Sequence, residues 1–169
     1  ALYDINSIEG RYALSVSSHY NEFSDKPIVY MEQLINEDIN NPFFYELLAE
    51  ILFTRNDFNG AIDKQKLSLK YFQGESDLLY MLMGNYLKQD KKFRDEAIKY
   101  IKSSLRINNS YTYSWFLLAD LYSDYDLPKA HYATAERYFL LGDYPMSYKF
   151  TVKSLKEIEK NTPEWYRAN

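Results

Sequence analysis

The sequence predicts an all-α fold, a right-handed α–α superhelix of about four helix hairpins that resembles a solenoid. Apolar residues recur with a helical period along nearly the whole chain. Valine, which favours strands, occurs only at positions 16, 29 and 152. The small residues Ala49, Gly84 and Ala119 are spaced 35 residues apart, each within a similar apolar phrase. Together these observations indicate repeated helical units rather than a sheet.

The repeating phrase reads LLAEILF at 47–53, MGNYL at 83–87 and LLADLY at 117–122. A polar turn follows each copy, and then a second helical pattern that contains Ala61, Ala97 or Ala130. A period of about 34 residues with two helices is typical of a tetratricopeptide repeat (TPR). One such unit cannot bury its apolar face alone, so neighbouring units stack. We therefore expect a helical surface that binds a partner rather than one that catalyses a reaction.

Helix signals divide the chain into short segments joined by connections that predict antiparallel neighbours. Asn41-Pro42 and Thr162-Pro163 each place a capping side chain before a proline, which favours a helix start. We expect residues 1–10 to be a linker or a helix start and residues 11–168 to form one TPR-like domain. The predicted helices are 7–21, 26–38, 42–55, 58–73, 76–88, 93–107, 110–124, 127–141, 144–160 and a stub at 163–168.

Small residues also recur within the second helices of the units. Ser68, Ser104 and Ser154 each follow a small residue by seven positions, which places both on one side of the helix, two turns apart. Small side chains at these positions let paired helices approach closely. The terminal units are less regular: Ser15 and Pro27 stand at the small positions of the first. The helix at 127–141 is expected to serve twice, as the second helix of one unit and the first helix of the next.

Composition excludes several classes of function. The net charge is −4, so the chain lacks the basic balance of a nucleic-acid-binding protein. It has no cysteine, and no run of 18 apolar residues that would form a transmembrane segment. The sequence begins with Ala rather than Met, so we expect a processed product or a piece of a longer protein.

Three passages of the sequence resemble one particular family among the proteins that contain TPRs. They are NPFFYEL at 41–47 with ILF at 51–53, ATAE at 133–136 with LLGDY at 140–144, and TPEWYRA at 162–168. Together they resemble the C-terminal TPR region of the periplasmic β-barrel-assembly-enhancing proteases, zinc metallopeptidases of the YfgC type. The resemblance covers residues from about 11 to 168. It implies a periplasmic interaction module that docks its own peptidase domain and recruits outer-membrane β-barrel proteins or their assembly machinery for quality control.

The catalytic motif of that family is absent from this sequence. The family binds zinc through an HExxH helix, whereas His19 is followed by Tyr-Asn-Glu and His131 by Tyr-Ala-Thr. We therefore transfer no catalytic, cofactor-binding or metal-binding residue, and we expect no enzyme activity and no cofactor. A free-standing TPR adaptor or chaperone cofactor, in the cytoplasm, remains the alternative. An initiator Met directly upstream would favour the adaptor, and a signal peptide with HExxH the protease.

The resemblance to the repeat assigns a binding groove to the first helices of the units. We call the residues that flank the small positions the first-helix face: Phe43, Glu46, Glu50, Phe53, Met81, Asn85, Lys88, Tyr113, Phe116, Asp120, Tyr132, Glu136 and Phe139. Aromatic and acidic side chains are mixed in this set. Carboxylates would repel the acidic tails that other repeats of this class clamp with Lys, Asn and Arg. We therefore expect an apolar or basic segment, held by aromatic anchors. The alternative for each aromatic residue is packing between units.

Two further groups of side chains favour structural roles. Six aromatic residues are expected to fill the gaps between helices: Tyr80, Tyr86, Tyr100, Trp115, Tyr122 and Tyr138. The basic turn formed by Lys88, Lys91, Lys92 and Arg94 could contact phosphate or an acidic lipid, but plain solvation is the more common role of such a turn.

Overall fold

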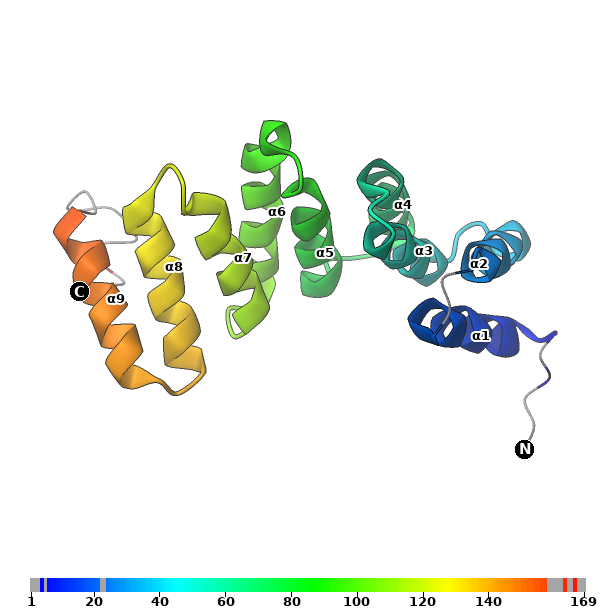
Figure 1. Ribbon diagram of the computed structural model, residues 1–169, viewed down its shortest axis with the longest axis horizontal. Coiled ribbons are helices and arrows are strands. Elements are labelled where there is room, and N and C mark those ends of the chain that lie inside the picture. The colour runs from blue at the N-terminus through cyan, green and yellow to red at the C-terminus, as the bar shows by residue number, and fades with distance from the viewer. Residues whose placement is uncertain (1–3, 5, 22–23, 158–162, 164–165, 167–169) are drawn as a thin grey trace. The chain divides into compact units, whose positions relative to one another are not determined.

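The computed structural model describes residues 4, 6–21, 24–157, 163 and 166. These residues form helices and connecting turns, with no strand among them, as the sequence predicts (Figure 1). The chain divides into two compact units, residues 1–75 and 76–169. The first holds α1 (Ile8–Asn21), α2 (Lys26–Glu37), α3 (Pro42–Thr54) and α4 (Phe58–Tyr71). The second holds α5 (Asp77–Leu87), the 3₁₀ turn η1 (Lys91–Phe93), α6 (Arg94–Ile107), α7 (Thr112–Tyr122), α8 (Leu127–Leu140) and α9 (Tyr144–Glu157).

Helix starts follow the capping chemistry of the sequence. Asn41 Oδ1 accepts a hydrogen bond from the Phe43 amide at 3.1 Å, and Pro42 occupies the first turn of α3, as predicted. Asp57 and Ser76 cap α4 and α5 in the same way. These side chains satisfy amides that the helix itself leaves without a partner. Most of the predicted stub at 163–168 lies outside the described residues.

The core of the first unit lies where α2 packs against α3. Its fully buried side chains include Met31, Leu34, Leu48 and Ile51, and Tyr12 and Val16 of α1 pack against this cluster. In the α1–α2 pair, Ser15 Oγ donates a hydrogen bond to the carbonyl oxygen of Pro27 at 3.0 Å. Ser15 is completely buried. The small positions of this irregular unit therefore meet across the two helices.

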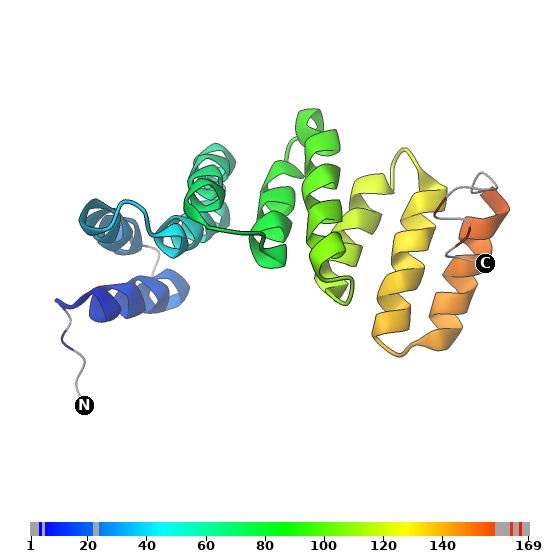
Figure 2. The same ribbon diagram turned by 180° about the vertical axis from the view of Figure 1, so that it is seen from behind.

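The second unit packs as successive antiparallel helices (Figure 2). In the α5–α6 pair, Gly84 faces Ile101: a Cβ built on Gly84 would lie 2.5 Å from Ile101 Cδ1 and 3.1 Å from the Ala97 carbonyl oxygen. Ser104 Oγ of α6 lies 2.9 Å from Ser114 Oγ of α7, and both residues are buried. Close approach of small residues thus sets the spacing of neighbouring helices.

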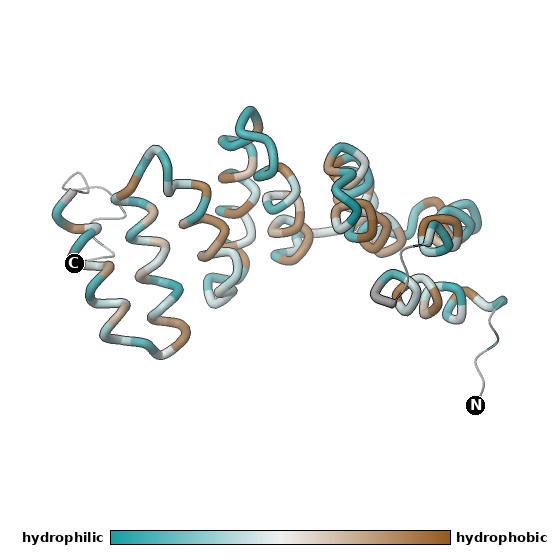
Figure 3. Tube along the Cα trace, in the orientation of Figure 1, coloured by the Kyte–Doolittle hydropathy of each residue, from teal (hydrophilic) through white to brown (hydrophobic). Residues whose placement is uncertain are grey.

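The repeated serines are buried as the spacing predicts. Ser68, Ser104 and Ser154 each have no exposed surface. Ser154 Oγ of α9 donates to the Pro128 carbonyl oxygen of α8 at 2.9 Å, which parallels the contact between Ser15 and Pro27 in the first unit. Hydrophobic stretches of the tube are seen on α3, α5 and α7 (Figure 3).

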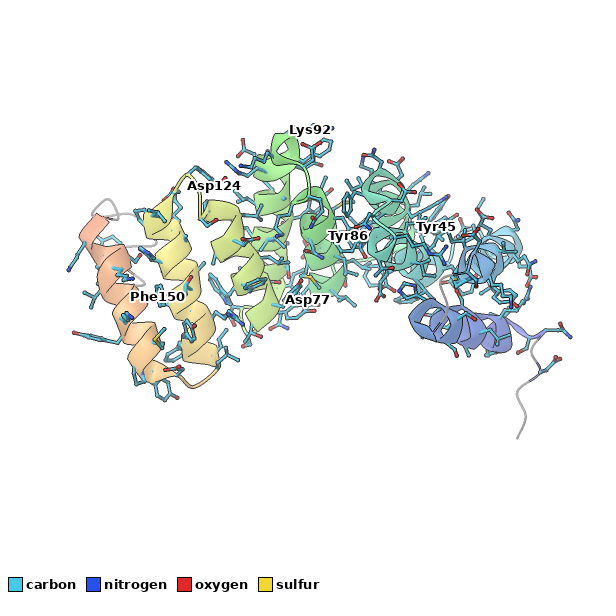
Figure 4. The ribbon with its side chains drawn as sticks, in the orientation of Figure 1. Tyr45, Asp77, Tyr86, Lys92, Asp124 and Phe150 are labelled. Carbon is cyan, nitrogen blue, oxygen red and sulfur yellow. The ribbon has the colours of Figure 1, made fainter. Side chains whose placement is uncertain are left out.

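Polar contacts join successive hairpins of the second unit. Asp124, in the α7–α8 turn, accepts from Lys91 Nζ of η1 at 3.1 Å and from Arg94 Nη2, at the start of α6, at 2.7 Å (Figure 4). At the other end of these helices, Asn108 Nδ2 donates to Asp77 Oδ2 at 2.9 Å. The basic turn therefore pairs with carboxylates, and the Lys91 hydrogen bond is the main cause that lowers the pKa of Asp124.

Candidate functional site

In the first unit, α3 carries four residues of the first-helix face. Phe43 is 52% exposed and its ring meets Phe72 edge-on, with centroids 6.2 Å apart. Phe53 is half-buried and packs against Phe58 across the α3–α4 turn at 5.5 Å. Phe43 thus offers more free aromatic surface than Phe53.

Glu46 and Glu50, one helical turn apart on α3, are both half-buried. Burial, followed by repulsion from Glu50, raises the pKa of Glu46 to about 7. The same two carboxylates raise the pKa of Tyr12 on α1, although burial is the larger cause. Burial lowers the pKa of His19, which Glu50 opposes. This part of the first-helix face is therefore acidic and partly desolvated, which favours a cation.

In the second unit, α7 carries an aromatic pair. Tyr113 and Phe116 stack with centroids 5.7 Å apart, and both remain about two-fifths exposed. The Arg137 guanidinium of α8 lies over the Phe116 ring at 5.2 Å. Asp120, one turn beyond Phe116, forms an ion pair with Lys88 of α5. The exposed rings of Tyr113 and Phe116 therefore lie beside an ion pair whose two charges offset each other.

The remaining predicted residues divide between surface and core. Phe139 is 58% exposed at the end of α8 and contacts Tyr144, while Asn85 and Glu136 are half-buried. Met81 is only 4% exposed and Tyr132 only 7%. Tyr132 is buried because its ring packs edge-on against Trp115 of α7, at 5.8 Å. Because Met81 and Tyr132 are buried, the exposed residues carry the first-helix-face proposal below.

The aromatic residues assigned to packing fill the gaps between helices as expected. Tyr86, Trp115 and Tyr122 are buried. Tyr80 packs against Tyr100 at 6.0 Å, and Tyr138 stacks on Phe150 of α9 at 5.8 Å (Figure 4). These rings stabilise helix pairs.

Among the described residues, no group of three or more histidine and acidic side chains is arranged to hold a metal ion. The described helices are also too short or too polar to cross a bilayer. His131 lies beside Phe150, with ring centroids 5.8 Å apart.

Comparison with solved structures agrees on the fold. MamA from Desulfovibrio magneticus RS-1 aligns with a TM-score of 0.72 at 14% identity, covering 89% of this chain and 94% of that one. YrrB, described as a TPR protein with an unusual peptide-binding site, aligns with a TM-score of 0.63 at 12% identity. The alignment covers 96% of this chain and 91% of YrrB. Yeast Tom70 aligns at 0.73 and 16%, covering 94% of this chain and 35% of Tom70. The chain therefore has a tetratricopeptide-repeat fold.

At the level of sequence, no protein-family model and no curated protein matches the chain. The likeness is thus one of fold and not of sequence.

Proposed function

We propose that this chain is a protein-interaction module in which the part of the first-helix face that each unit carries binds an apolar or basic segment of a partner. The exposure of Phe43, Phe116 and Phe139 on an otherwise well-packed helical fold is the observation that carries the proposal. Aromatic side chains anchor protein interfaces because they bury a large area at a small cost in conformational entropy. YrrB, which has the same fold, is described as having an unusual peptide-binding site, and this supports a peptide-binding role.

The acidic part of the face favours a cationic partner group. Glu46 is partly buried beside Glu50. Burial and, to a smaller extent, repulsion from the Glu50 carboxylate both raise the pKa of Glu46. A lysine or arginine side chain placed between the two carboxylates would relieve that repulsion. An acidic tail would add to it.

We further propose that the module is the C-terminal TPR domain of a periplasmic zinc metallopeptidase of outer-membrane protein quality control. Its role there is to dock the peptidase domain and to recruit β-barrel proteins or their assembly machinery. The three passages at 41–53, 133–144 and 162–168 support this assignment. Linking a binding surface to a peptidase raises the effective concentration of substrate without adding any chemistry. The complete coding sequence tests it: a signal peptide and HExxH upstream support the protease, and an initiator Met directly upstream contradicts it.

Peptide binding tests the interaction surface itself. The probe is a labelled peptide with the alternating apolar and polar pattern of a β-barrel strand, in a version with Lys and Arg and a version with Asp and Glu. We expect fluorescence anisotropy to show tighter binding of the basic version. Phe43→Ala or Phe116→Ala should weaken it by roughly 30-fold if the ring is an anchor, which corresponds to about 2 kcal/mol.

Matched controls are Ile39→Ala and Tyr125→Ala, which truncate exposed apolar side chains in turns outside the first-helix face. Both should leave the affinity unchanged. Equal losses in the control variants, or tight binding of the acidic version that Phe116→Ala abolishes, would overturn the proposal.

A further inference from the structure

The second unit contains a pocket of about 580 Å³ on a face other than the one described above. Its lining comes from the C-terminal half of α6, the turn that follows, α7 and the first turns of α8. On α7 the pocket uses Trp115, Leu118 and Tyr122, which recur with helical spacing. Tyr113, Phe116 and Asp120 lie on the opposite side of that helix, since successive residues turn by about 100°. Tyr132 belongs to both sets, and the other residues that line the pocket are distinct from those of the first-helix face.

Aromatic rings form a fixed apolar wall of this pocket. The Trp115 indole Nε1 donates a hydrogen bond to the Asn109 carbonyl oxygen at 2.8 Å, which holds the ring in one orientation. Tyr132 packs edge-on against it at 5.8 Å. A preformed apolar wall favours a large apolar side chain over a small hydrated anion.

Three cationic side chains, Lys102, Arg106 and Lys129, line the same pocket. Two of them lie near the Tyr122 ring, with the Lys102 ammonium 5.9 Å and the Lys129 ammonium 5.6 Å from its centroid. Asp126 binds Lys129 Nζ at 2.6 Å and offsets part of this charge. No carboxylate lines the pocket among its described residues, although the chain as a whole carries a net charge of −4.

We propose that this pocket binds a short acidic segment of a partner protein, with one aromatic or large aliphatic side chain against Trp115 and Tyr132. Flanking carboxylates of the segment meet Lys102, Arg106 and Lys129. The volume matches a few side chains rather than a whole helix. Charge complementarity selects the acidic partner, and the aromatic wall selects a segment that also carries an apolar anchor. The module thus presents the first-helix face, which prefers a basic segment, and this pocket, which prefers an acidic one.

The test uses the full chain and a labelled peptide of about ten residues, rich in Asp and Glu, with a central Phe. One comparison peptide replaces Phe by Ala, and another replaces the acids by Lys. Binding is followed by anisotropy, and by Trp115 emission in a Trp165→Phe background because the chain has two tryptophans. We expect only the Phe-containing acidic peptide to change the Trp115 emission, because the Lys version should bind the first-helix face instead. The double change Lys102→Glu and Arg106→Glu should weaken binding of the acidic peptide at least tenfold.

Lys99→Glu is the matched control, because Lys99 is exposed on α6 and does not line the pocket. It reverses one charge where the double variant reverses two, and it should alter the affinity less than twofold, as should Phe116→Ala. Far-ultraviolet circular dichroism verifies that each variant keeps its helical content. Loss of acidic-peptide binding on Phe116→Ala would instead contradict the first-helix-face proposal, so failures of the two proposals are distinguishable.

Several results would overturn the pocket assignment: no binding, equal weakening by Lys99→Glu, or tighter binding of a single-stranded oligonucleotide that needs the same lysines. Self-association of the chain that the double variant abolishes would identify a second copy as the occupant. Pro163 also lines the pocket. Displacement of the acidic peptide by a peptide of residues 158–169 would therefore identify this chain's own C-terminal segment as the occupant.

Discussion

Glu46 illustrates how the fold changes the chemistry of a single side chain. Sequence spacing places it one turn from Glu50, which predicts mutual repulsion of modest size on an exposed helix. The structure adds partial burial, and burial is the larger cause of the shift of its pKa to about 7. The desolvation could not be predicted from the sequence, because it depends on how the surrounding helices cover α3.

Glu46 should make the stability of the first unit depend on pH. Its folded pKa lies above the ordinary value, so the folded state keeps a proton that the unfolded chain releases between pH 4.5 and about 7. The free energy of unfolding should therefore fall as the pH rises from 5 to 8. In Glu46→Gln the free energy of unfolding should fall less over this range. The variant should therefore become more stable relative to the wild type at pH 8 than it is at pH 5.

Urea unfolding at both pH values measures the effect. Glu32→Gln is the control, since Glu32 is an exposed carboxylate on α2. The same pH dependence in wild type and Glu46→Gln would contradict the assigned burial.

At the scale of the element, helix pairs are the part of the molecule that the sequence predicts best. Ala49, Ala61 and Ala97 mark positions with no exposed surface, and caps such as Asn41 place helix starts correctly. The turn after α5 carries a short 3₁₀ helix at Lys91–Phe93 that periodicity does not reveal. Gly84 shows why the small positions matter, because Ile101 of α6 occupies the space of its missing side chain.

Replacement of Gly84 by Ala should destabilise the second unit by roughly 1–2 kcal/mol, even though Ala favours helices by up to about 1 kcal/mol. The added Cβ would meet both Ile101 and the less movable Ala97 carbonyl oxygen. Ile101→Val removes the Cδ1 methyl group, one of the two Ile101 atoms in conflict, so the double variant should lose less stability than the sum of the single changes. Denaturant unfolding of the two single variants and the double variant measures the coupling energy between Gly84 and Ile101. If the two single losses of stability simply add in the double variant, the close packing of Gly84 against Ile101 is contradicted.

The candidate site was less predictable than the helices. Repeat spacing finds Phe43, Tyr113, Phe116 and Phe139, which are exposed, but it also selects Met81 and Tyr132, which are buried. Tyr132 is buried because it lies on the side of α8 that packs against Trp115 of α7. The cationic pocket escaped prediction because its lysines and arginine come from two helices that only tertiary packing brings together. The spacing of Lys102 and Arg106, one turn apart, was the available signal.

At the scale of the whole molecule, the repeat explains why the chain offers extended surfaces for binding. Each unit buries its own small and apolar positions, which leaves aromatic side chains of the first helices facing solvent. Similarity to other TPR structures at 12–17% identity fixes the architecture and not the partner. The partner must therefore be read from the chemistry of the exposed residues.

Amide chemical-shift mapping of the isotopically labelled chain with the basic peptide tests the central claim most directly. We predict saturable shifts that concentrate on α3 and α7, around Phe43, Glu46, Phe116 and Asp120, with α2 and α4 little changed. Shifts confined to α6 and the α6–α7 turn, or the same pattern with the acidic version of the peptide, would contradict recognition by the first-helix face.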